Sequence, residues 1–563
     1  MPTLIQFGAG NIGRGFIAPL FTAGGWRVCF VDIDATRINA VQQRGRYTVC
    51  EVDTDLRRPV VVEPVDGLLA SDGAAVAAAV AEADLVATAV GLGALRHLGP
   101  ALAAGLKARD PGRPLDILVC ENGVQAPELL RQAISAGLDD PSLLSRVGLV
   151  RTSIGRMIPP ERGGDPLDIS VEPYAHLPVE AAAFVGPPPV GIPGLDLAND
   201  FDLVLHQKLY LHNLTHACLG YSGQRGGHDT IPDCMTDPTL VSRVRRASDE
   251  IIAALALNHD HDAASQAAIA SACQVLRDDL FQRYTNRALG DPVARICRDP
   301  LRKLAADDRL VGAARLALAQ GLRPMALLHH ILDACAYVPA ADEPQATTFI
   351  QATSQGWPAV LELTAHLSQL PDKEILMTAM TLAQRQQEAA AIIRNAGIHL
   401  RDDEVEQIEI ADFGLGRYHE IGLAIHVYVN TARCCAKELA MTPGMICPEH
   451  RHPSIDGEPG KEETFRVRAG VCHLFLPGEA SEEERQAALS LLPADKQDSV
   501  SVLRRVTLHQ GQQCTLPPDT LHWFVAGPEG AVVSEFSTAS RDDADVFTDP
   551  AIVRVPEDGP HSG

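Results

Sequence analysis

Short runs of apolar residues recur through the first third of the chain, and each is followed by a segment of helical or loop character. The runs are TLIQF (3–7), RVCFVD (27–32), DLVATAV (84–90), LDILVC (115–120) and VGLVR (147–151). Continuous apolar strands that alternate with helices are typical of a parallel sheet covered on both faces. The pattern therefore predicts a Rossmann-type, doubly wound α/β domain over residues 1–195.

Two other patterns follow along the chain. Between residues 196 and 387 the apolar positions have helical spacing and few are β-branched, as in ASQAAIASACQVLRDDL (264–280), which predicts an all-α domain. Beyond it, strand-like runs return between Pro- and Gly-containing turns, as in LAIHVYVNT (423–431) and ETFRVRAGVCHLFL (463–476). This series predicts an all-β barrel or sandwich over residues 388–563.

The composition agrees with a folded protein of several domains. A chain of 563 residues with 46% hydrophobic side chains is too long for one core and too apolar to be disordered. Its formal net charge of -24 repels phosphate polymers and anionic lipid, so we expect no nucleic-acid and no membrane partner. The 13 cysteines form no C-x-x-C pair and the N-terminus does not resemble a signal peptide, so we expect a cytoplasmic protein.

A glycine-rich turn directly follows the first predicted strand. In FGAGNIGRGF, Gly8, Gly10 and Gly13 match G-x-G-x-x-G, a turn that places a pyrophosphate at a helix N-terminus. Asn11 and Ile12 lie within the motif and belong to the predicted cofactor site. The alternative is a glycine turn without a ligand.

The second predicted strand ends in Asp32, about 20 residues further on, where an acid accepts hydrogen bonds from a ribose 2′-hydroxyl. Because a carboxylate there repels a 2′-phosphate, we predict NAD rather than NADP as the cofactor. We interpret Asp34, two residues on, as an ordinary turn residue.

The stretch KLYLHNLTH, residues 208–216, carries three polar side chains that can border one cleft on a helix. A partly desolvated Lys208 can exchange a proton with a substrate hydroxyl, while Asn213 and His216 can donate hydrogen bonds to a developing alkoxide. A surface lysine, a capping asparagine and a core histidine would give the same spacing, so spacing alone leaves both interpretations open.

Four motifs together resemble the polyol-specific long-chain dehydrogenases. They are FGAGNIGRGF, CEN at 120–122, the K-x-x-x-x-N-x-x-H helix and RDPLRKL at 298–304, and the likeness covers roughly residues 1–385. The resemblance implies metal-independent hydride transfer between a polyol carbon and NAD. It also implies that Lys208 is the general acid–base, that Asn213 and His216 polarise the carbonyl oxygen, and that Asn122 and Arg298 contact the substrate.

The chain departs from that family at one position. Gly155 precedes Arg156 in SIGRMIP, where the family usually has the Asp of D-R-x-x-P. Arg302 and Lys303 are candidates for binding a substrate phosphate, but solvated helix residues would look the same. The identity of the polyol, and whether it is phosphorylated, therefore stay open.

The C-terminal third contains two histidines separated by one residue. On a strand, His450 and His452 point to the same face, where both can reach one metal ion. With Glu463 and the distant His522 they fit the two-part cupin signature, a divalent metal site with three His and one Glu in a small barrel. The alternative is a solvated histidine pair, and Glu462 competes with Glu463 as the carboxylate ligand.

Further motifs in this region resemble the D-lyxose isomerase family of cupins over roughly residues 390–555. They are ADFGLG, YVNTARCCAKEL, CPEHRHP, GKEETFR, LPPDTLHWF and SEFST. The resemblance implies a cupin barrel, the four metal ligands already named, Mn as the ion, and Lys461 with Glu535 as the proton-transfer pair. Without it, Lys461 would be interpreted as a solvated loop lysine and Glu535 as a surface strand residue.

The two sites together predict a bifunctional sugar enzyme. One site would interconvert a polyol or polyol phosphate with a 2-ketose, and the other would isomerise an aldose and a ketose with a bound metal. The main alternative is a polyol dehydrogenase with a sugar-binding regulatory cupin, and a non-enzymatic NAD-dependent regulator is a third. We expect small-molecule polyol and sugar partners, and a homodimer through the cupin domain stays open.

Overall fold

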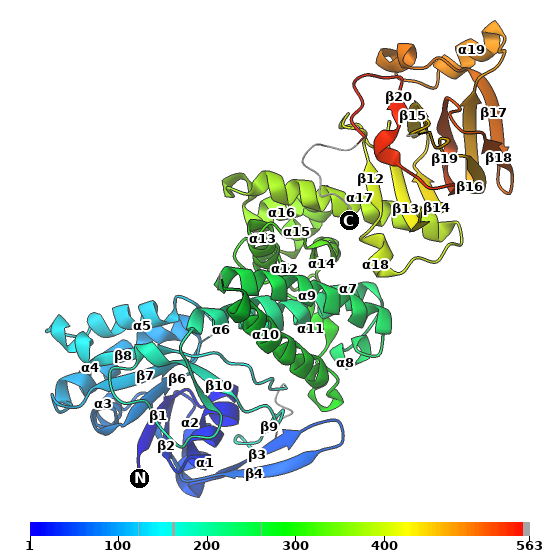
Figure 1. The fold of residues 1–563 in the computed structure, drawn as a ribbon. Helices are drawn as coiled ribbons and strands as arrows, with labels where there is room; N and C mark the ends of the chain where they lie inside the picture. Colours follow the sequence, from blue (N-terminus) through cyan, green and yellow to red (C-terminus); the bar gives the residue numbers. More distant parts are fainter. Residues whose placement is uncertain (122, 160–163, 260–261, 456, 555–563) are drawn as a thin grey trace. The chain divides into compact units, whose positions relative to one another are not determined.

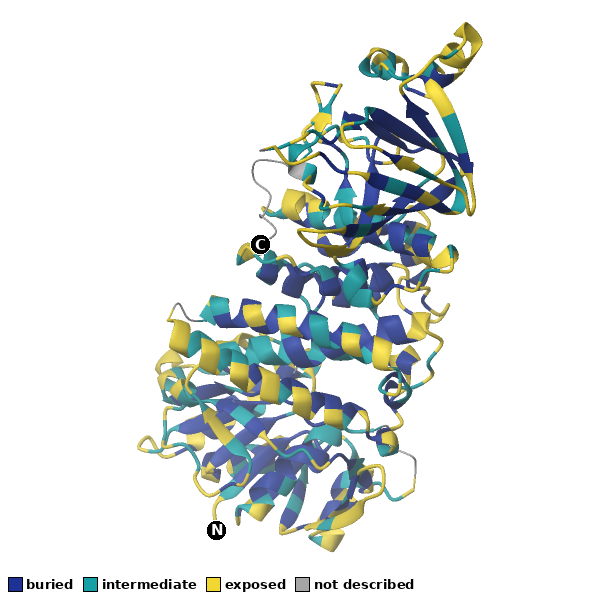
Figure 2. Cartoon of the chain, turned by 45° about the vertical axis from the view of Figure 1, so that its right-hand side comes forward, coloured by how far each residue is buried: buried dark blue, intermediate teal, exposed yellow. Residues whose placement is uncertain are grey.

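The computed structural model describes residues 1–121, 123–159, 164–259, 262–455 and 457–554. Contacts within the chain divide it into two compact units, Met1–Gln369 and Leu370–Gly563 (Figure 1). In both units the strands are largely buried, whereas many helices expose one face (Figure 2).

A parallel sheet forms the first part of the N-terminal unit. Within the described residues it has six strands in the order β5-β2-β1-β6-β7-β8. The strands are β1 (Thr3–Phe7), β2 (Arg27–Asp32), β5 (Val65–Leu69), β6 (Leu85–Thr88), β7 (Leu115–Val119) and β8 (Val147–Arg151). The strand order reverses between β1 and β6, and in open α/β sheets ligands bind at such a switch point.

Successive residues of these strands contribute to two separate cores. Leu4, Val28 and Phe30 pack on one face of the sheet, and Ile5 and Val31 pack on the other. The helices between the strands are α1 (Ala18–Ala23), α2 (Ala35–Arg44), α3 (Gly73–Glu82), α4 (Gly99–Ala108) and α5 (Ala126–Ser135). The predicted α/β domain, buried on both faces of its sheet, is confirmed.

Two small sheets extend this domain. Strands β3 (Tyr47–Val52) and β4 (Arg57–Val62) form a hairpin, and β9 (Ile169–Val171) pairs with β3. Strands β10 (Leu177–Glu180) and β11 (Leu195–Ala198) form a second, two-stranded sheet. The three-stranded sheet matters for the site because Glu51 lies on β3 and Glu172 directly follows β9.

The rest of the N-terminal unit is helical, as predicted. Its helices are α6 (Phe201–Gln207), a π-helical segment (Lys208–Asn213), α7 (Leu214–Arg225), α8 (Ile231–Cys234), α9 (Pro238–His259), α10 (Ala263–Tyr284), α11 (Val293–Cys297), α12 (Pro300–Lys303), α13 (Val311–Ala319), α14 (Met325–Cys335), α15 (Ala346–Thr353) and α16 (Trp357–Ala365). No described helix is long and apolar enough to cross a membrane.

The C-terminal unit is built on an antiparallel sheet that has nine strands within the described residues. They are β12 (Glu409–Ala411), β13 (Leu423–Asn430), β14 (Cys435–Met441), β15 (Ile446–Arg451), β16 (Glu463–Leu476), β17 (Arg504–His509), β18 (Gln513–Leu516), β19 (His522–Ser537) and β20 (Val546–Phe547). The short helix α18 (Asp402–Val405) precedes the first strand, and α19 (Glu482–Leu489) lies between β16 and β17. The all-β prediction for this part is confirmed.

The long helix α17 (Lys373–Asn395) belongs to the C-terminal unit. It contributes Ala389, Ala390 and Ile393 to the same core as the strands. The predicted domain boundary at 387/388 therefore falls inside a continuous helix, whereas the contacts divide the chain after Gln369.

Two candidate active sites

The turn after β1 requires glycine for steric reasons. Gly8 has φ +95°, and a Cβ there would lie 2.3 Å from the carbonyl oxygen of Ala89. A Cβ on Gly13 would lie 2.1 Å from the carbonyl oxygen of Gly8, so this turn and the helix start pack too closely for any side chain. A Cβ on Gly10 meets nothing within 4 Å. The outer side of the turn is therefore open, which suits a pyrophosphate held by backbone amides.

Two acidic residues near the end of β2 have different partners. Asp32 accepts hydrogen bonds from the backbone N–H of Ala9, at 2.5 Å, and of Asp34, at 2.9 Å. Its carboxylate therefore lies beside the glycine turn. The Asp34 carboxylate instead caps α2 by accepting from Thr36 and Arg37, which confirms its interpretation as a local structural residue.

A buried glutamate at the end of β7 was missed by the sequence analysis. Glu121 accepts hydrogen bonds from the Thr88 hydroxyl, at 2.7 Å, and from the Val90 N–H, at 3.0 Å. It thereby ties the end of β7 to the loop after β6, on the far side of the switch point from Gly8. Burial raises the pKa of Glu121 despite these hydrogen bonds. Its neighbour Asn122, a predicted substrate residue, lies outside the described residues.

Lys208 opens a π-helical segment between α6 and α7. The sequence analysis assumed one regular helix, which is wrong for residues 208–213. Because i→i+5 hydrogen bonds widen the turn, residues four and five apart lie on nearly the same side, and such bulges are frequent at functional sites. Lys208 and Asn213 are thus closer in angle than an α-helix would place them.

The environment of Lys208 suits proton exchange near neutral pH. Burial, together with the charges of Arg283 and Arg309, lowers the pKa of Lys208 to about 7, although Glu172 opposes the shift. Its Nζ lies 2.9 Å from Nδ1 of His212, and burial lowers the pKa of His212 well below its usual range. His212 was not predicted, although its i+4 spacing from Lys208 is visible in the sequence.

His216 is oriented by an acid on the neighbouring segment. Its Nε2 lies 2.8 Å from Oδ2 of Asp291, and its ring stacks on Tyr284 with centroids 5.3 Å apart. Arg295 pairs with the other oxygen of Asp291. Burial lowers the pKa of His216 although Asp291 opposes the shift, so His216 is neutral at pH 7.

The basic residues of RDPLRKL lie in different environments. Arg298 is half exposed and pairs with Asp342 at 3.3 Å, and none of its contacts in the described part of the chain joins it to the helix of Lys208. Arg302 pairs with Asp299 at 2.8 Å. Lys303 is buried, and its burial lowers its pKa to about 8.

Gly155 lies in a space that an aromatic ring and an arginine fill. A Cβ on Gly155 would lie 3.1 Å from Cε1 of Tyr174. Arg283 lies over the Tyr174 ring at 3.9 Å, donates to the Gly155 carbonyl, and forms a fork with Glu172 at 2.6 and 2.9 Å. Where the dehydrogenase family usually has an Asp, this chain has no side chain, and Glu172 supplies the buried carboxylate nearby.

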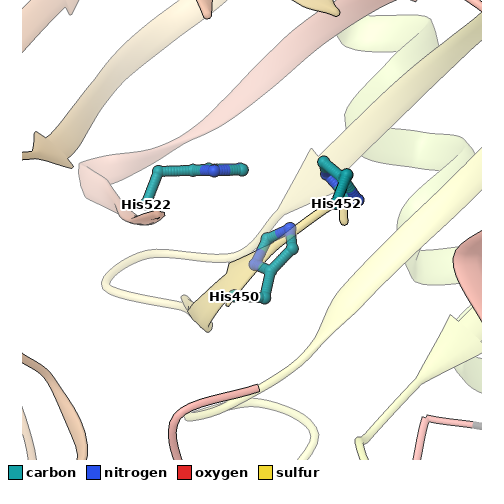
Figure 3. Close-up of side chains that lie close together, drawn as sticks. All are labelled: His450, His452 and His522. Atoms are coloured by element: carbon teal, nitrogen blue, oxygen red, sulfur yellow. The ribbon is translucent and has the colours of Figure 1, made fainter. Parts of the chain in front are cut away.

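In the C-terminal unit, three histidines converge. Their ligand-type nitrogens lie within 4.8 Å of one another, and all three side chains are buried (Figure 3). His450 comes from β15, His452 follows it and His522 begins β19. Oε1 of Glu463 lies 3.3 Å from Nε2 of His452 and 3.2 Å from Nε2 of His522.

The hydrogen bonds of the Nδ1 atoms show which histidine nitrogens can bind a metal. His450 Nδ1 donates to the Pro448 carbonyl at 2.8 Å, and His522 Nδ1 donates to the Thr520 carbonyl at 2.9 Å. Because a carbonyl only accepts, Nδ1 carries the proton in both rings and Nε2 keeps a lone pair. The Nε2 atoms of His452 and His522 are buried without a hydrogen-bond partner within the described residues. Such orphaned nitrogens beside a carboxylate fit a divalent cation.

The structure distinguishes Glu463 from its competitor Glu462. Glu463 is buried and lies against the histidines, whereas Glu462 is exposed. Burial would raise the pKa of Glu463, but Lys461 and the histidines outweigh it and hold that pKa well below the usual range. Burial lowers the pKa of His522. At neutral pH both groups are therefore in the form that binds metal.

The predicted proton-transfer pair is joined and buried. Lys461 Nζ lies 2.9 Å from Oε1 of Glu535 and 2.9 Å from Oε2 of Glu463. Both side chains line the same cavity of about 420 Å³ as His450 and His452. The interpretation of Lys461 and Glu535 as solvated surface residues is therefore wrong. Burial lowers the pKa of Lys461, but Glu535 and Glu463 outweigh it and raise that pKa.

Four further charged side chains of this cavity were missed by the sequence analysis: Lys437, Asp542, Asp545 and Arg554. Asp542 pairs with Lys437 at 2.7 Å and with Arg554 at 3.5 Å. The segment that carries the two aspartates, RDDADV, has no strand or helix periodicity that would mark it. Lys437 and Arg554 are thus each paired with Asp542. The uncharged side chains of the cavity wall are mainly aliphatic and aromatic.

A dinucleotide-type turn and a lysine of lowered pKa in the N-terminal unit, with a histidine–carboxylate cluster beside a lysine–glutamate pair in the C-terminal unit, define a fused dehydrogenase and sugar isomerase. Comparison with known proteins agrees: residues 2–190 match the mannitol dehydrogenase Rossmann domain, 201–394 the mannitol dehydrogenase C-terminal domain and 400–559 D-lyxose isomerase. The chain belongs to the mannitol dehydrogenase family in its first two domains and to the D-lyxose isomerase family in its third. It is an enzyme of both families, and the Rossmann domain implies NAD(H).

Individual relatives match each part separately. A mannitol-1-phosphate 5-dehydrogenase from Halalkalibacterium halodurans is 35% identical over 343 residues, 60% of this chain and 89% of that protein. A D-lyxose ketol-isomerase from a Thermofilum species is 46% identical over 182 residues, 32% of this chain and 99% of that protein. The structure of Pseudomonas fluorescens mannitol 2-dehydrogenase, solved with NAD and D-mannitol, aligns with a TM-score of 0.53 and 18% identity over 69% of this chain and 92% of its own. That likeness shows a shared fold.

Proposed function

We propose that the N-terminal unit interconverts mannitol 1-phosphate and fructose 6-phosphate, or a related polyol and its 2-ketose, with NAD. The observation that carries the proposal is the partly buried Lys208, whose pKa is lowered to about 7 and whose Nζ lies 2.9 Å from Nδ1 of His212. The relative named mannitol-1-phosphate 5-dehydrogenase supports the phosphorylated substrate. Gly8, Gly10, Asn11, Ile12, Gly13 and Asp32 would hold the cofactor.

In oxidation, neutral Lys208 takes the proton of the reacting hydroxyl. Bound NAD supplies the hydride acceptor. Asn213 donates its amide N–H to the developing oxyanion. Asn122 and Arg298 stay proposed substrate contacts from the resemblance.

For His216 we propose a role that differs from the expected one. Its Nε2 faces the carboxylate of Asp291, which only accepts, so Nε2 carries the proton. In a neutral ring Nδ1 then holds a lone pair and accepts a hydrogen bond from a substrate hydroxyl. Donation to the carbonyl oxygen is therefore left to Asn213 and to protonated Lys208.

A panel of ketoses tests this first activity. NADH consumption is followed with fructose 6-phosphate, fructose and xylulose, each at a range of concentrations. We expect the highest kcat/KM with fructose 6-phosphate. A preference for an unphosphorylated ketose would replace the phosphorylated substrate, and no NADH oxidation with any of them would contradict the dehydrogenase proposal.

We propose that the C-terminal unit is a cupin that isomerises an aldose and a ketose, of the D-lyxose/D-xylulose or D-mannose/D-fructose type. His450, His452, Glu463 and His522 would hold a divalent cation, Mn by resemblance. A divalent cation held there would supply electrostatic stabilisation for the negative charge that develops on the sugar oxygens during isomerisation.

The raised pKa of Lys461 decides the roles within the proton-transfer pair. Lys461 stays an ammonium and donates to Glu535 and Glu463. Glu535 is therefore the base that moves the proton between C1 and C2. The hydrogen bond from Lys461, at 2.9 Å, holds the Glu535 carboxylate in the wall of the cavity.

Chelation tests the second activity and its alternative. Aldose formation from xylulose and fructose should vanish in metal-free protein and return with Mn²⁺. If metal-loaded protein forms no aldose, the cupin is a regulatory sugar-binding domain. The burial of Lys461 and Glu535 in the ligand cavity favours the isomerase.

A further inference from the structure

The segment Ser540–Thr548 lies against the histidine cluster and is anchored at both ends. Near its start, Lys437 Nζ donates to Ser540 Oγ at 3.0 Å and to Asp542 at 2.7 Å. Near its end, Phe547 pairs with His450 in the sheet and lies on its ring, with centroids 5.4 Å apart. Asp545 sits between these anchors, with 8% of its side chain exposed.

Asp545 is hydrogen-bonded to one member of the cluster. Its Oδ1 lies 2.5 Å from Nδ1 of His452. His450 and His522 bond instead to the carbonyl two residues before each of them, Pro448 and Thr520. The orientation of those two rings is thus set locally by their own backbone, whereas that of His452 depends on a side chain 93 residues away.

We propose that Asp545 is a positioning residue of the isomerase, which fixes His452 with Nδ1 protonated and Nε2 directed at the cation. The inference rests on the proposed metal site. A carboxylate accepts only, so Nδ1 carries a proton toward Asp545, and Nε2 is the ring nitrogen that faces the other histidines and Glu463. Nε2 of His452 is one of the buried nitrogens without a partner in the described part of the chain.

Among the described residues that line the cavity, no other acid is placed to replace Asp545. Asp542 is engaged by Lys437 and Arg554, and Glu535 is engaged by Lys461. Carboxylates behind metal-binding histidines also make the ring a stronger donor, and losing one typically weakens metal binding about 10- to 100-fold. We expect a loss of that size from Asp545→Ala.

The test measures metal binding by the full chain at fixed pH, separately from activity. Metal-free wild type, Asp545→Ala and Asp545→Asn are titrated with Mn²⁺ in a calorimeter, and the visible spectrum of Co²⁺-loaded protein reports the coordination. We expect Kd for Mn²⁺ to rise about 10- to 100-fold in Asp545→Ala, with a changed Co²⁺ spectrum. Asp545→Asn should lose less, because its amide oxygen still accepts from Nδ1.

Asp549→Asn is the matched control. Asp549 pairs with Lys496 at 2.7 Å and lies on the same stretch of chain, but it does not contact the histidines. Wild-type Mn²⁺ affinity in this control supports the inference, and an equal loss in it overturns the specific role of Asp545. Wild-type Mn²⁺ affinity in both Asp545 variants also overturns the role of Asp545. If Asp545→Ala fails to fold, the affinity of Asp545→Asn alone decides. A wild-type chain that binds no Mn²⁺ overturns the metal site itself.

Discussion

The ionisation of Lys208 should govern the pH dependence of polyol oxidation. Burial and the charges of Arg283 and Arg309 lower its pKa from 10.5 to about 7. At pH 7 about half of these side chains are then neutral, against about one in three thousand for a lysine of ordinary pKa. Because the neutral amine takes the proton, kcat for oxidation should fall about tenfold per pH unit below the midpoint and level off above it.

Initial rates of NADH formation from mannitol 1-phosphate measure this profile at saturating substrate. We use kcat because the substrate phosphate itself titrates near pH 6 and would alter KM. The reverse reaction is an internal control: ketose reduction needs the ammonium form, so its kcat should fall above the same midpoint. A midpoint near the ordinary lysine value, or profiles of the same sign in both directions, would refute the assignment.

Variants at position 208 separate chemistry from stability. Lys208→Ala should lower kcat about 10²- to 10⁴-fold, while Lys107→Ala, at an exposed lysine paired with Asp139, should not change it. The pKa of Lys208 is lower in the folded chain than in the unfolded chain, so between about pH 7 and 10.5 the unfolded chain binds more protons. Below pH 7 the folded chain carries the charged lysine, and its desolvation then lowers the free energy of unfolding by the full amount. Lys208→Met should therefore raise the melting temperature of the N-terminal unit most below pH 7.

Three further changes probe the two halves separately. Asp32→Ser should raise KM for NAD about ten- to a hundredfold, the loss of a charge-assisted hydrogen bond, and improve use of NADP, while Asp34→Ala should only destabilise α2 by about 1 kcal/mol. His450→Ala or chelation should abolish aldose formation in a coupled sugar assay and leave NADH turnover intact; loss of both would contradict separate sites. Trp523→Ala, which removes a fully buried ring stacked on Phe475 at 3.9 Å, should cost about 3–5 kcal/mol in urea unfolding of the C-terminal unit, and Trp523→Phe much less.

The sequence predicted the parts of the fold whose pattern is continuous. Five strands of the parallel sheet are apolar runs because both of their faces are buried. The sixth, β5, was missed because its sequence VDGLL contains Asp66 and Gly67, which reduce strand propensity. The hairpin β3–β4 was missed for a similar reason, since its second strand RRPVVV begins with exposed charges and a proline.

For the sites, sequence patterns found residues that share a short motif but not those that act from elsewhere. His450, His452 and Glu463 belong to one stretch of chain and were found together, and the distant His522 was found because the cupin signature has a second part of its own. Asp291, behind His216, and Asp545, behind His452, come from distant segments with no spacing that relates them. Pairs of this kind depend on tertiary packing, which one sequence does not reveal.

The contact between Gly155 and Tyr174 makes the two positions interdependent in evolution. A Cβ at 155 would lie 3.1 Å from the Tyr174 ring, on which the Arg283 guanidinium is stacked, so the ring would have to shift by a few tenths of an ångström. Restoring the family's aspartate at 155 alone should therefore damage the site, whereas the same change with a smaller residue at 174 should be tolerated. A mutant library at either position alone would miss the functional combination, which exists only as a double substitution.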